Sequence, residues 1–431
     1  MKNKNNKYTI IGNSAAAIAA VESIRKVDQE SGITLIASEE HHTYSRPLIS
    51  YWLGGEVDDE RMPYRPPDFY EKNGVDTMLG VEVTSVDPEP RVLTTRDGDE
   101  VPFDRLLIAT GGTPIVPPDV EGAEAEGVFT FTTWEDARAI ESYIEEHGVK
   151  KALVVGAGLI GLKSTEALGA REIEVTVVEL ADRVLSATFD NTASMLAREA
   201  MEKAGIHTLC ENTVSSIEQE EGRVRSATLR DGTEVDAELV LFAIGVRPNT
   251  ALVQDTPIQV DRGILVDDRM ETSVEGIYAA GDVAQAGQLL TDERRTLPIL
   301  PTAYRQGSVA GSNMAGATRK YEGGVPMNSV DIFGLPTISV GMTAPDDEDT
   351  ECLTRFEEEE NTYKKLVLKD DRIVGAIFIG DIERAGIFTG LIKQKVDVSR
   401  FKDVLLSDDF GLLSLPAEYR KHVVSGLGME V

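Results

Sequence analysis

The stretch KKALVVGAGLIGLKSTEALGA (residues 150–170) decides the fold, because it joins an apolar strand, a glycine-rich turn and a helix. Its turn, GAGLIG, places Gly156, Gly158 and Gly161 in a complete GxGxxG fingerprint, and IEVTVVE (173–179) supplies the next strand. In such a turn the first glycine bends the chain, the second lets a pyrophosphate approach the backbone, and the third allows close helix packing. The stretch therefore predicts a Rossmann-like unit that binds a dinucleotide.

Glu179 closes the second strand of this unit, 23 residues after Gly156. A carboxylate at that place accepts hydrogen bonds from both ribose hydroxyls and repels a 2′-phosphate, which favours NADH over NADPH. Arg183 follows four residues later and partly offsets this preference.

A second unit of the same kind begins the chain, with KYTIIGNSAAAIAAVESIRKV (7–27) followed by GITLIAS (32–38). Only Gly12 of its turn is a glycine, although Ser14 is small enough for a close approach. Glu39 ends the next strand, where an acidic residue can hold a ribose. Taken alone, this turn is compatible with a dinucleotide site and with an ordinary strand–helix connection.

Strand–helix–strand alternation predicts parallel sheets with right-handed crossovers. Two further strands, in RLLIATGGTPIVPP (105–118) and ELVLFAIGVRPNT (238–250), are interpreted as segments that leave one domain and return to the other. From about residue 325 the pattern changes to short strands with turns and then a helical tail. The predicted fold class is α/β, with two Rossmann-like dinucleotide-binding domains and a C-terminal α+β domain.

Charge and composition limit the partners of the chain. The 431 residues carry a net charge of -31, from 43 basic and 74 acidic residues. This charge argues against nucleic acid or an anionic membrane as a partner, and it allows steering toward a basic protein. The plainer interpretation is an acidic surface that keeps the protein soluble. No apolar run approaches the ~20 residues of a membrane span, and MKNKNNKYTII lacks a signal peptide's pattern, so we expect a cytoplasmic protein.

Ordered motifs along the whole chain carry a family resemblance: IIGNSAAAIAA, YSRPLIS, LLIATGGTP, VVGAGLIGL, FAIGVRPN and TSVEGIYAAGDVA. With them the chain resembles the two-dinucleotide-binding-domain flavoproteins of the pyridine nucleotide-disulfide oxidoreductase superfamily. Within that superfamily it is most similar to NADH:rubredoxin reductases, ferredoxin reductases of oxygenase systems and the FAD region of the nitrite reductase large subunit. The resemblance implies FAD and NAD(H) as cofactors.

The resemblance also implies domain boundaries and site residues. The FAD-binding domain would span 1–115 and 250–324, the NAD(H)-binding domain 116–249, and a C-terminal interface or dimerisation domain 325–431. Around FAD, the turn of Gly12, Asn13, Ser14 and Ala15 would hold the pyrophosphate, and Glu39 would hold the adenosine ribose. Arg46 and Pro47 would line the flavin, and Ala109, Thr110 and Gly111 would lie along the cofactor. Gly281 and Asp282 would bind the ribityl and phosphate end of FAD. Tyr304 would face the flavin ring, or it is a core aromatic. Gly156, Gly158, Gly161 and Glu179 would bind NAD(H), with Gly245 near the nicotinamide.

Two departures from the family pattern matter. Many relatives have Glu two residues after the third glycine of the second fingerprint, where this chain has Lys163. Disulfide reductases, and the coenzyme A-disulfide reductases, oxidases and peroxidases of this superfamily, carry redox cysteines near the flavin. The corresponding loop here, HHTYSRPLISYWLGG (41–55), has serines at Ser45 and Ser50 but no cysteine.

Serine offers no stable redox couple, and the chain's two cysteines, Cys210 and Cys352, lie elsewhere without CxxC spacing. The resemblance therefore implies that electrons leave the flavin directly. We predict no catalytic side chain and no metal site, since the cofactors carry the chemistry. Arg46 is the best candidate to tune the reduced flavin by its charge, with an ion-pairing arginine as the alternative.

The leading hypothesis is an FAD-dependent NADH oxidoreductase that serves a one-electron iron–sulfur acceptor. That acceptor would be a rubredoxin, a ferredoxin, or the iron–sulfur subunits of a larger redox complex such as an aldehyde oxidoreductase. The alternatives are a flavin NADH oxidase or disulfide-type reductase, and a non-catalytic subunit that binds FAD and NAD. The sequence leaves open the acceptor, the direction of electron flow and whether the chain forms a homodimer.

Overall fold

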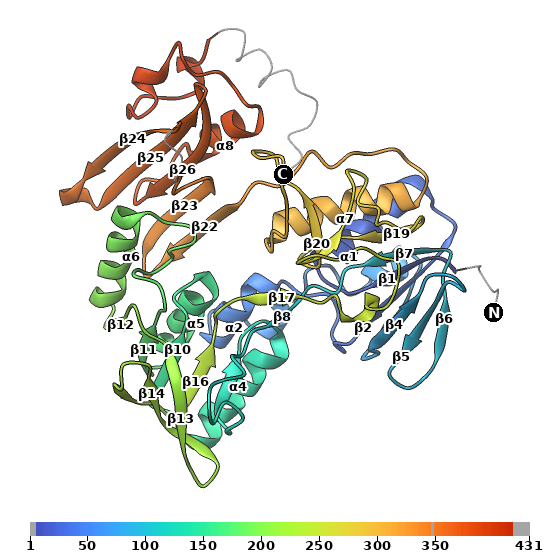
Figure 1. Ribbon diagram of the computed structural model, residues 1–431, viewed down its shortest axis with the longest axis horizontal. Helices are drawn as coiled ribbons and strands as arrows, with labels where there is room; N and C mark the ends of the chain where they lie inside the picture. The colour runs from blue at the N-terminus through green and yellow to red at the C-terminus, as the bar shows by residue number, and fades with distance from the viewer. Residues whose placement is uncertain (1–5, 346–348, 417–431) are drawn as a thin grey trace. The chain divides into compact units, whose positions relative to one another are not determined.

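The structure is a computed structural model that describes residues 6–345 and 349–416 (Figure 1). Residues 1–5 of the predicted FAD-binding domain, and 417–431 of the predicted C-terminal domain, lie outside the described residues. The chain divides into two compact units. The first unit comprises Met1–Leu180 and His207–Gly324, and the second comprises Ala181–Ile206 and Val325–Val431.

The first unit begins with a five-stranded parallel sheet in the order β19-β7-β1-β2-β3. Its strands are β1 (Asn6–Ile11), β2 (Gly32–Ala37), β3 (Val75–Leu79), β7 (Arg105–Ile108) and β19 (Ile277–Ala279). Every residue of β2 is buried, as expected for a parallel strand covered on both faces. β19 comes from a distant part of the sequence, so the chain completes this sheet only after it has built the next one.

Two helices pack together on this sheet, α1 (Ala15–Val27) and α7 (Leu300–Met314). Their backbones nearly touch, because a Cβ atom at Gly307 would lie 2.0 Å from the carbonyl oxygen of Ala16. A Cβ at Gly311 would similarly lie 2.4 Å from the carbonyl of Ala20. The alanine-rich start of α1 and the glycines of α7 thus allow a contact that larger side chains would prevent.

The second five-stranded parallel sheet of this unit has the order β12-β11-β10-β16-β9. Its strands are β9 (Val128–Thr130), β10 (Lys151–Val155), β11 (Glu174–Val178), β12 (His207–Leu209) and β16 (Leu239–Phe242). Two helices accompany it, α4 (Trp134–His147) and α5 (Leu159–Ala170). With the first sheet, it confirms the predicted α/β class with two Rossmann-like domains.

The predicted crossing segments pair with each other. β8 (Gly112–Pro114) and β17 (Val246–Pro248) form an antiparallel ribbon, so the chain leaves the first sheet and returns to it through adjacent strands. Smaller elements complete the unit: α2 (Ile49–Leu53), α3 (Phe69–Lys72), β4 (Val83–Asp87), β5 (Val92–Thr95), β6 (Glu100–Pro102), β13 (Val214–Glu220), β14 (Arg223–Leu229), β15 (Glu234–Asp236), β18 (Ile264–Leu265), β20 (Ala284–Gly287) and β21 (Arg294–Arg295).

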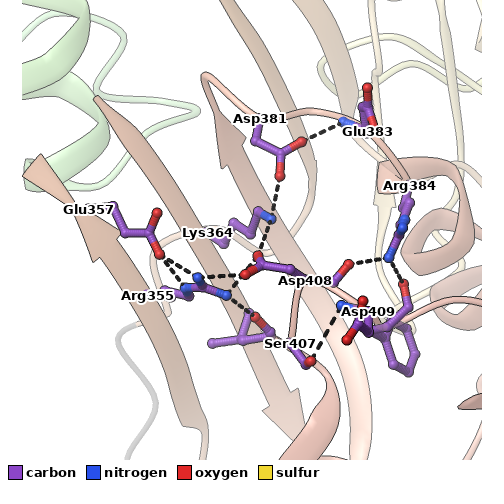
Figure 2. Close-up of polar contacts among 11 residues, drawn as sticks. Arg355, Glu357, Lys364, Asp381, Glu383, Arg384, Ser407, Asp408 and Asp409 are labelled. Carbon is purple, nitrogen blue, oxygen red and sulfur yellow. Dashed lines mark hydrogen bonds and ion pairs between the residues drawn. The ribbon is translucent and has the colours of Figure 1, made fainter. Parts of the chain in front are cut away.

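The second unit contains an antiparallel sheet in the order β22-β23-β26-β25-β24. The strands of this sheet are β22 (Met327–Ile332), β23 (Leu335–Gly341), β24 (Glu351–Glu357), β25 (Thr362–Lys369) and β26 (Arg372–Ile379). The helices of the unit include α6 (Asn191–Lys203) and α8 (Ala385–Lys393). Figure 2 shows how the segment after α8 is held on this sheet. Arg355 of β24 donates to both carboxylate oxygens of Asp408 at 2.8 Å, and Lys364 of β25 lies 3.8 Å from the same carboxylate.

Helix α6 lies between β11 and β12 in the sequence but packs within the second unit. Asp190 caps its N-terminus and also accepts hydrogen bonds from Tyr363 at 2.8 Å and from the nearly buried Lys365 at 2.9 Å. The boundaries at residues 115, 249 and 324 stay a proposal, in which α6 would belong to the NAD(H)-binding domain. Within the described ranges, no helix has the length and apolar character that crossing a membrane requires.

Candidate functional site

The turn after β1 is shaped by Gly12, which has φ +119°. A Cβ atom there would lie 2.1 Å from the carbonyl oxygen of Ala109, so the ends of β1 and β7 meet at a point where only glycine fits. Ser14 is the N-cap of α1, yet within the described part of the chain its side chain makes no capping hydrogen bond. The first backbone N–H groups of α1 are therefore available to an anion such as a pyrophosphate.

Asn13 connects this turn to the loop after β2. Its amide nitrogen donates to the carbonyl of His41 at 3.1 Å, and its amide oxygen accepts from the Tyr70 hydroxyl at 2.6 Å. The Thr43 backbone N–H in turn donates to the Tyr70 oxygen at 3.0 Å. Asn13 therefore orients the loop that leads to the predicted flavin-facing residues.

Glu39 and Arg46, predicted as separate cofactor contacts, form an ion pair with each other. The other carboxylate oxygen of Glu39 accepts from the Tyr44 hydroxyl at 2.6 Å. Arg46 also donates to the carbonyl of Thr132 at 2.7 Å. Burial lowers the pKa of Arg46, but Tyr44 and Glu39 outweigh it, so the pKa lies above its usual value and the guanidinium is charged. Pro47 follows Arg46 in the first turn of a short 3₁₀-helix that runs into α2.

Sequence reasoning missed Tyr44, Tyr70 and Thr132 in this network. Tyr44 lay inside the quoted YSRP motif, so its aromatic ring next to an arginine was a signal that could have been used. Thr132 carried no signal, because it contributes only a backbone carbonyl from a distant part of the chain.

The segment Ala109–Gly111 follows β7, beside the ends of β1 and β19. Thr110 donates its hydroxyl to the carbonyl of Asn249 at 3.0 Å, and the Asn249 amide donates back to the carbonyl of Thr110 at 2.9 Å. Gly111 has φ +67°, and a Cβ there would meet nothing within 4 Å. These residues thus form an open backbone edge at the carboxyl ends of the parallel strands, where α/β proteins bind ligands.

Asp282 follows β19 and Gly281, whose backbone N–H donates to the Gln306 side chain at 2.9 Å. Burial raises the pKa of Asp282, while the charge of Arg46 opposes that shift. Among the residues that the structure describes, none donates a hydrogen bond to this carboxylate. A partly buried acceptor without a donor costs free energy, and the ribityl hydroxyls of FAD are donors of the kind it lacks.

Tyr304 lies in the first turns of α7, and its hydroxyl donates to Glu22 of α1 at 2.6 Å. Glu22 also accepts from Arg65 at 2.7 Å. Burial and this hydrogen bond raise the pKa of Tyr304 to about 12. In the structure the hydroxyl of Tyr304 thus links α7 to α1 by a hydrogen bond. The contact of Tyr304 with a flavin stays a prediction.

The three glycines of the second fingerprint have different steric roles. A Cβ at Gly156, which has φ +105°, would lie 2.7 Å from the carbonyl of Ala243. A Cβ at Gly161 would lie 1.9 Å from the carbonyl of Gly156, so this glycine allows α5 to pack on the turn. At Gly158, by contrast, a Cβ would meet nothing within 4 Å. The open side of the turn lies at Gly158, at the N-cap of α5, as a pyrophosphate site requires.

Glu179 follows β11, and its carboxylate accepts from the backbone N–H of Ala157 at 2.6 Å. Gly245 follows β16 with φ +112°, and a Cβ there would meet nothing within 4 Å. Exposed aliphatic side chains stand beside these residues: Leu180 is 59% exposed, Ile244 40% and Ile160 39%. A carboxylate for a ribose, an open helix N-terminus and bare apolar surface together fit a dinucleotide with two flat rings.

Helices α2 and α5 bring the two candidate cofactor sites together. Arg171, at the end of α5, donates to the carbonyl of Leu53 and pairs with Glu141 of α4. A Cβ at Gly54 would lie 3.5 Å from the Cα of Ala167, so the two helices approach closely. Lys163 of α5 also faces α2, because its ammonium lies 4.7 Å from the centre of the Tyr51 ring.

Family comparisons agree with this geometry. The pyridine nucleotide-disulphide oxidoreductase family matches residues 6–307, which include every site residue described above. The rubredoxin NAD⁺ reductase C-terminal domain family matches residues 326–396, within the second unit.

Individual proteins show the same similarity over most of the chain. The chain is 34% identical to the NADH-dependent phenylglyoxylate dehydrogenase subunit epsilon of Aromatoleum evansii, over 91% of this chain and 93% of that one. It is 32% identical to the nitrite reductase [NAD(P)H] of Bacillus subtilis over 91% of this chain, which spans 48% of that protein. The structure of an NAD-dependent persulfide reductase from A. fulgidus matches with a TM-score of 0.85 and 28% identity, over 92% of this chain and 78% of that one.

Proposed function

Because the chain belongs to the pyridine nucleotide-disulphide oxidoreductase family, we propose that it is an NADH-dependent flavoprotein that passes electrons to a one-electron iron–sulfur acceptor. Its class as an NAD(P)H oxidoreductase, with FAD and NAD(H) as cofactors, follows from membership of the family. The preference for NADH and the nature of the acceptor are the parts that we propose. The specific contacts of the site residues are proposals as well.

The described residues fit both cofactors. Asp282 offers a half-buried acceptor to the ribityl hydroxyls, and the uncapped start of α1 offers N–H groups to the FAD pyrophosphate. Gly158 and Glu179 offer the corresponding contacts to NAD(H). When bound, FAD supplies the ability to take one hydride, with its two electrons, from NADH and to release the electrons singly. The chain's own part is to hold the two cofactors in place across the α2–α5 contact and to keep other reactants away.

The observation that carries the proposal is the loop between β2 and α2, where a thiol-dependent enzyme of this family would place its cysteine. Ser45 stands in that loop and Ser50 at the start of α2, and the charged, partly buried Arg46 lies between them in sequence. The chain's two cysteines follow β12, at Cys210, and lie in β24, at Cys352. Serine cannot form a disulfide, so no thiol of this loop can receive electrons.

Two comparisons support an iron–sulfur acceptor. The second unit is similar to the C-terminal domain of rubredoxin reductases. The epsilon subunit, covered almost end to end, is by its name part of a multi-subunit NADH-dependent dehydrogenase, which favours iron–sulfur subunits of a larger complex as the acceptor. A positive Arg46 also stabilises negative charge on a reduced flavin, and so helps it to hold electrons until an acceptor docks.

One experiment separates this function from a sulfur or oxygen reductase. FAD-loaded protein is reduced with NADH without oxygen and then mixed with a rubredoxin, a ferredoxin, coenzyme A disulfide or air, while the visible flavin absorbance is followed. We expect fast reoxidation by an iron–sulfur protein and slow reoxidation by the disulfide and by air. Fast reoxidation by coenzyme A disulfide or air, with none by either iron–sulfur protein, would overturn the proposal.

A further inference from the structure

Lys163 is a charged side chain at the contact between α5 and α2. It lies in the second turn of α5, just past the fingerprint glycines, and forms an ion pair with Glu166. Its ammonium also lies over the ring of Tyr51 in α2, and both members of the ion pair are only about one-fifth exposed. The α2 helix directly follows the loop that holds Arg46 and Pro47.

The ammonium of Lys163 is charged at neutral pH. Burial lowers its pKa, but the hydrogen bond and charge of Glu166, together with Tyr51, outweigh the burial and hold the pKa above its usual value. Since the side chain is mostly shielded from water, its charge is less screened than that of a surface lysine.

The direction in which a dinucleotide must run brings its nicotinamide toward this lysine. Glu179 marks the adenosine end and follows β11, on one side of β10 in the sheet. Gly245 follows β16, on the other side of β10. A dinucleotide with its pyrophosphate at Gly158 therefore extends its second half toward β16 and toward α2, where a hydride must reach the flavin.

We propose that Lys163 determines which redox form of the nicotinamide the site prefers, by holding a positive charge that repels the cationic ring of NAD⁺ but not the uncharged dihydronicotinamide ring of NADH. This inference rests on the proposed function and deepens it, because it says which nicotinamide form competes better for the site. NAD⁺ formed at the site would leave readily, and free NAD⁺ would compete poorly with NADH. Glu166 offsets part of the charge, so the two residues act with opposite sign.

The test compares ligands that differ in ring charge. Calorimetric titrations of the FAD-loaded protein would use NAD⁺, tetrahydro-NADH (a reduced analogue whose ring is uncharged and cannot deliver a hydride) and ADP-ribose, which lacks the ring. We expect Lys163→Met to lower the ratio of the NAD⁺ dissociation constant to the tetrahydro-NADH dissociation constant by about tenfold. The isosteric Glu166→Gln should raise the same ratio, and ADP-ribose affinity should change less than about twofold in both variants.

The outcomes separate the possible failures. Equal changes for NAD⁺ and tetrahydro-NADH in the Lys163→Met protein would show a merely structural lysine and overturn the inference. The inference would also be overturned if the ratio of the NAD⁺ and tetrahydro-NADH dissociation constants stayed unchanged in both variants. If the unmodified protein bound none of the three ligands, the proposed NADH function itself would fall, whatever the variants did.

Discussion

At the scale of single residues, the acidic groups of the candidate site differ in what satisfies them. Glu39 forms an ion pair with Arg46 and accepts a hydrogen bond from Tyr44, and Glu179 accepts a hydrogen bond from a backbone N–H. Asp282 is held near a positive charge but, in the described part of the chain, accepts no hydrogen bond. A partly buried carboxylate without a hydrogen-bond donor costs stability in the folded protein, and a ligand that donates hydrogen bonds to Asp282 would remove that cost.

The variant Asp282→Asn tests that reading of the residue. Burial raises the pKa of Asp282 in the folded protein above its value in the unfolded chain. At a pH above the unfolded-chain pKa, ionisation of Asp282 therefore destabilises the folded protein. At a pH below that value, the carboxyl is protonated in both states and the cost disappears. We expect the cofactor-free variant to be more resistant to urea at neutral pH, with the advantage shrinking as the pH is lowered. FAD should bind it more weakly. A variant that lost stability at neutral pH and kept full FAD affinity would contradict this role.

Glu179 should determine the choice between NADH and NADPH. The substitution Glu179→Gln removes the charge that repels a 2′-phosphate but keeps an oxygen that can accept from Ala157. We expect the ratio of kcat/KM for NADPH to that for NADH to rise by about tenfold, or ~1.4 kcal/mol. Glu174→Gln, which changes an exposed glutamate at the start of β11, is the matched control and should leave the ratio unchanged. A similar rise in both variants would mean that only general surface charge matters.

At the scale of elements, the sequence predicts the two strand–turn–helix units well, because glycine and strand patterns are local. The contact of α1 with α7 was not predictable, since it joins residues that are far apart in sequence and depends on alanines meeting glycines. The ion pair of Glu39 with Arg46 was missed for a related reason. Each residue looked like a ligand contact when its motif was considered alone, and only the folded loop brings them together.

The close helix contact gives a stability prediction. Gly307→Ala would place a Cβ 2.0 Å from the Ala16 carbonyl, so α1 and α7 would have to move apart. We expect the free energy of unfolding to fall by about 3 kcal/mol. Gly169→Ala in α5 is the control, because its Cβ would meet nothing within 4 Å. It should gain about 0.5–1 kcal/mol from helix propensity. Urea unfolding measures both, and equal effects would refute a tight α1–α7 contact.

At the scale of the whole molecule, the net charge of -31 affects how an acceptor approaches. We expect kcat/KM for a basic one-electron acceptor such as cytochrome c to fall about tenfold as the ionic strength rises from about 0.01 M to about 0.15 M. An uncharged quinone is the control and should show little change. If turnover with the basic acceptor were insensitive to salt, the acidic surface would serve solubility alone.

The sequence could also predict the change to a third structural pattern after residue 325, but not how α6 is grouped. That helix lies within the second Rossmann-like pattern, yet Asp190 at its start bonds to Tyr363 and Lys365. Nothing local to residues 181–206 indicates partners so distant in the sequence. Pattern reasoning therefore predicts the glycine-rich strand–turn–helix units, which are local, better than the packing partners, which are not.

The central claim is that electrons pass from NADH through FAD to an acceptor without any protein thiol. The most direct measurement is an anaerobic titration with NADH of the FAD-loaded protein and of its Cys210→Ser/Cys352→Ser double variant, followed by flavin absorbance. We predict that one equivalent of NADH bleaches the flavin completely in both proteins, at the same rate. A second equivalent consumed by the unmodified protein, but not by the double variant, would reveal a redox-active thiol pair and contradict the account.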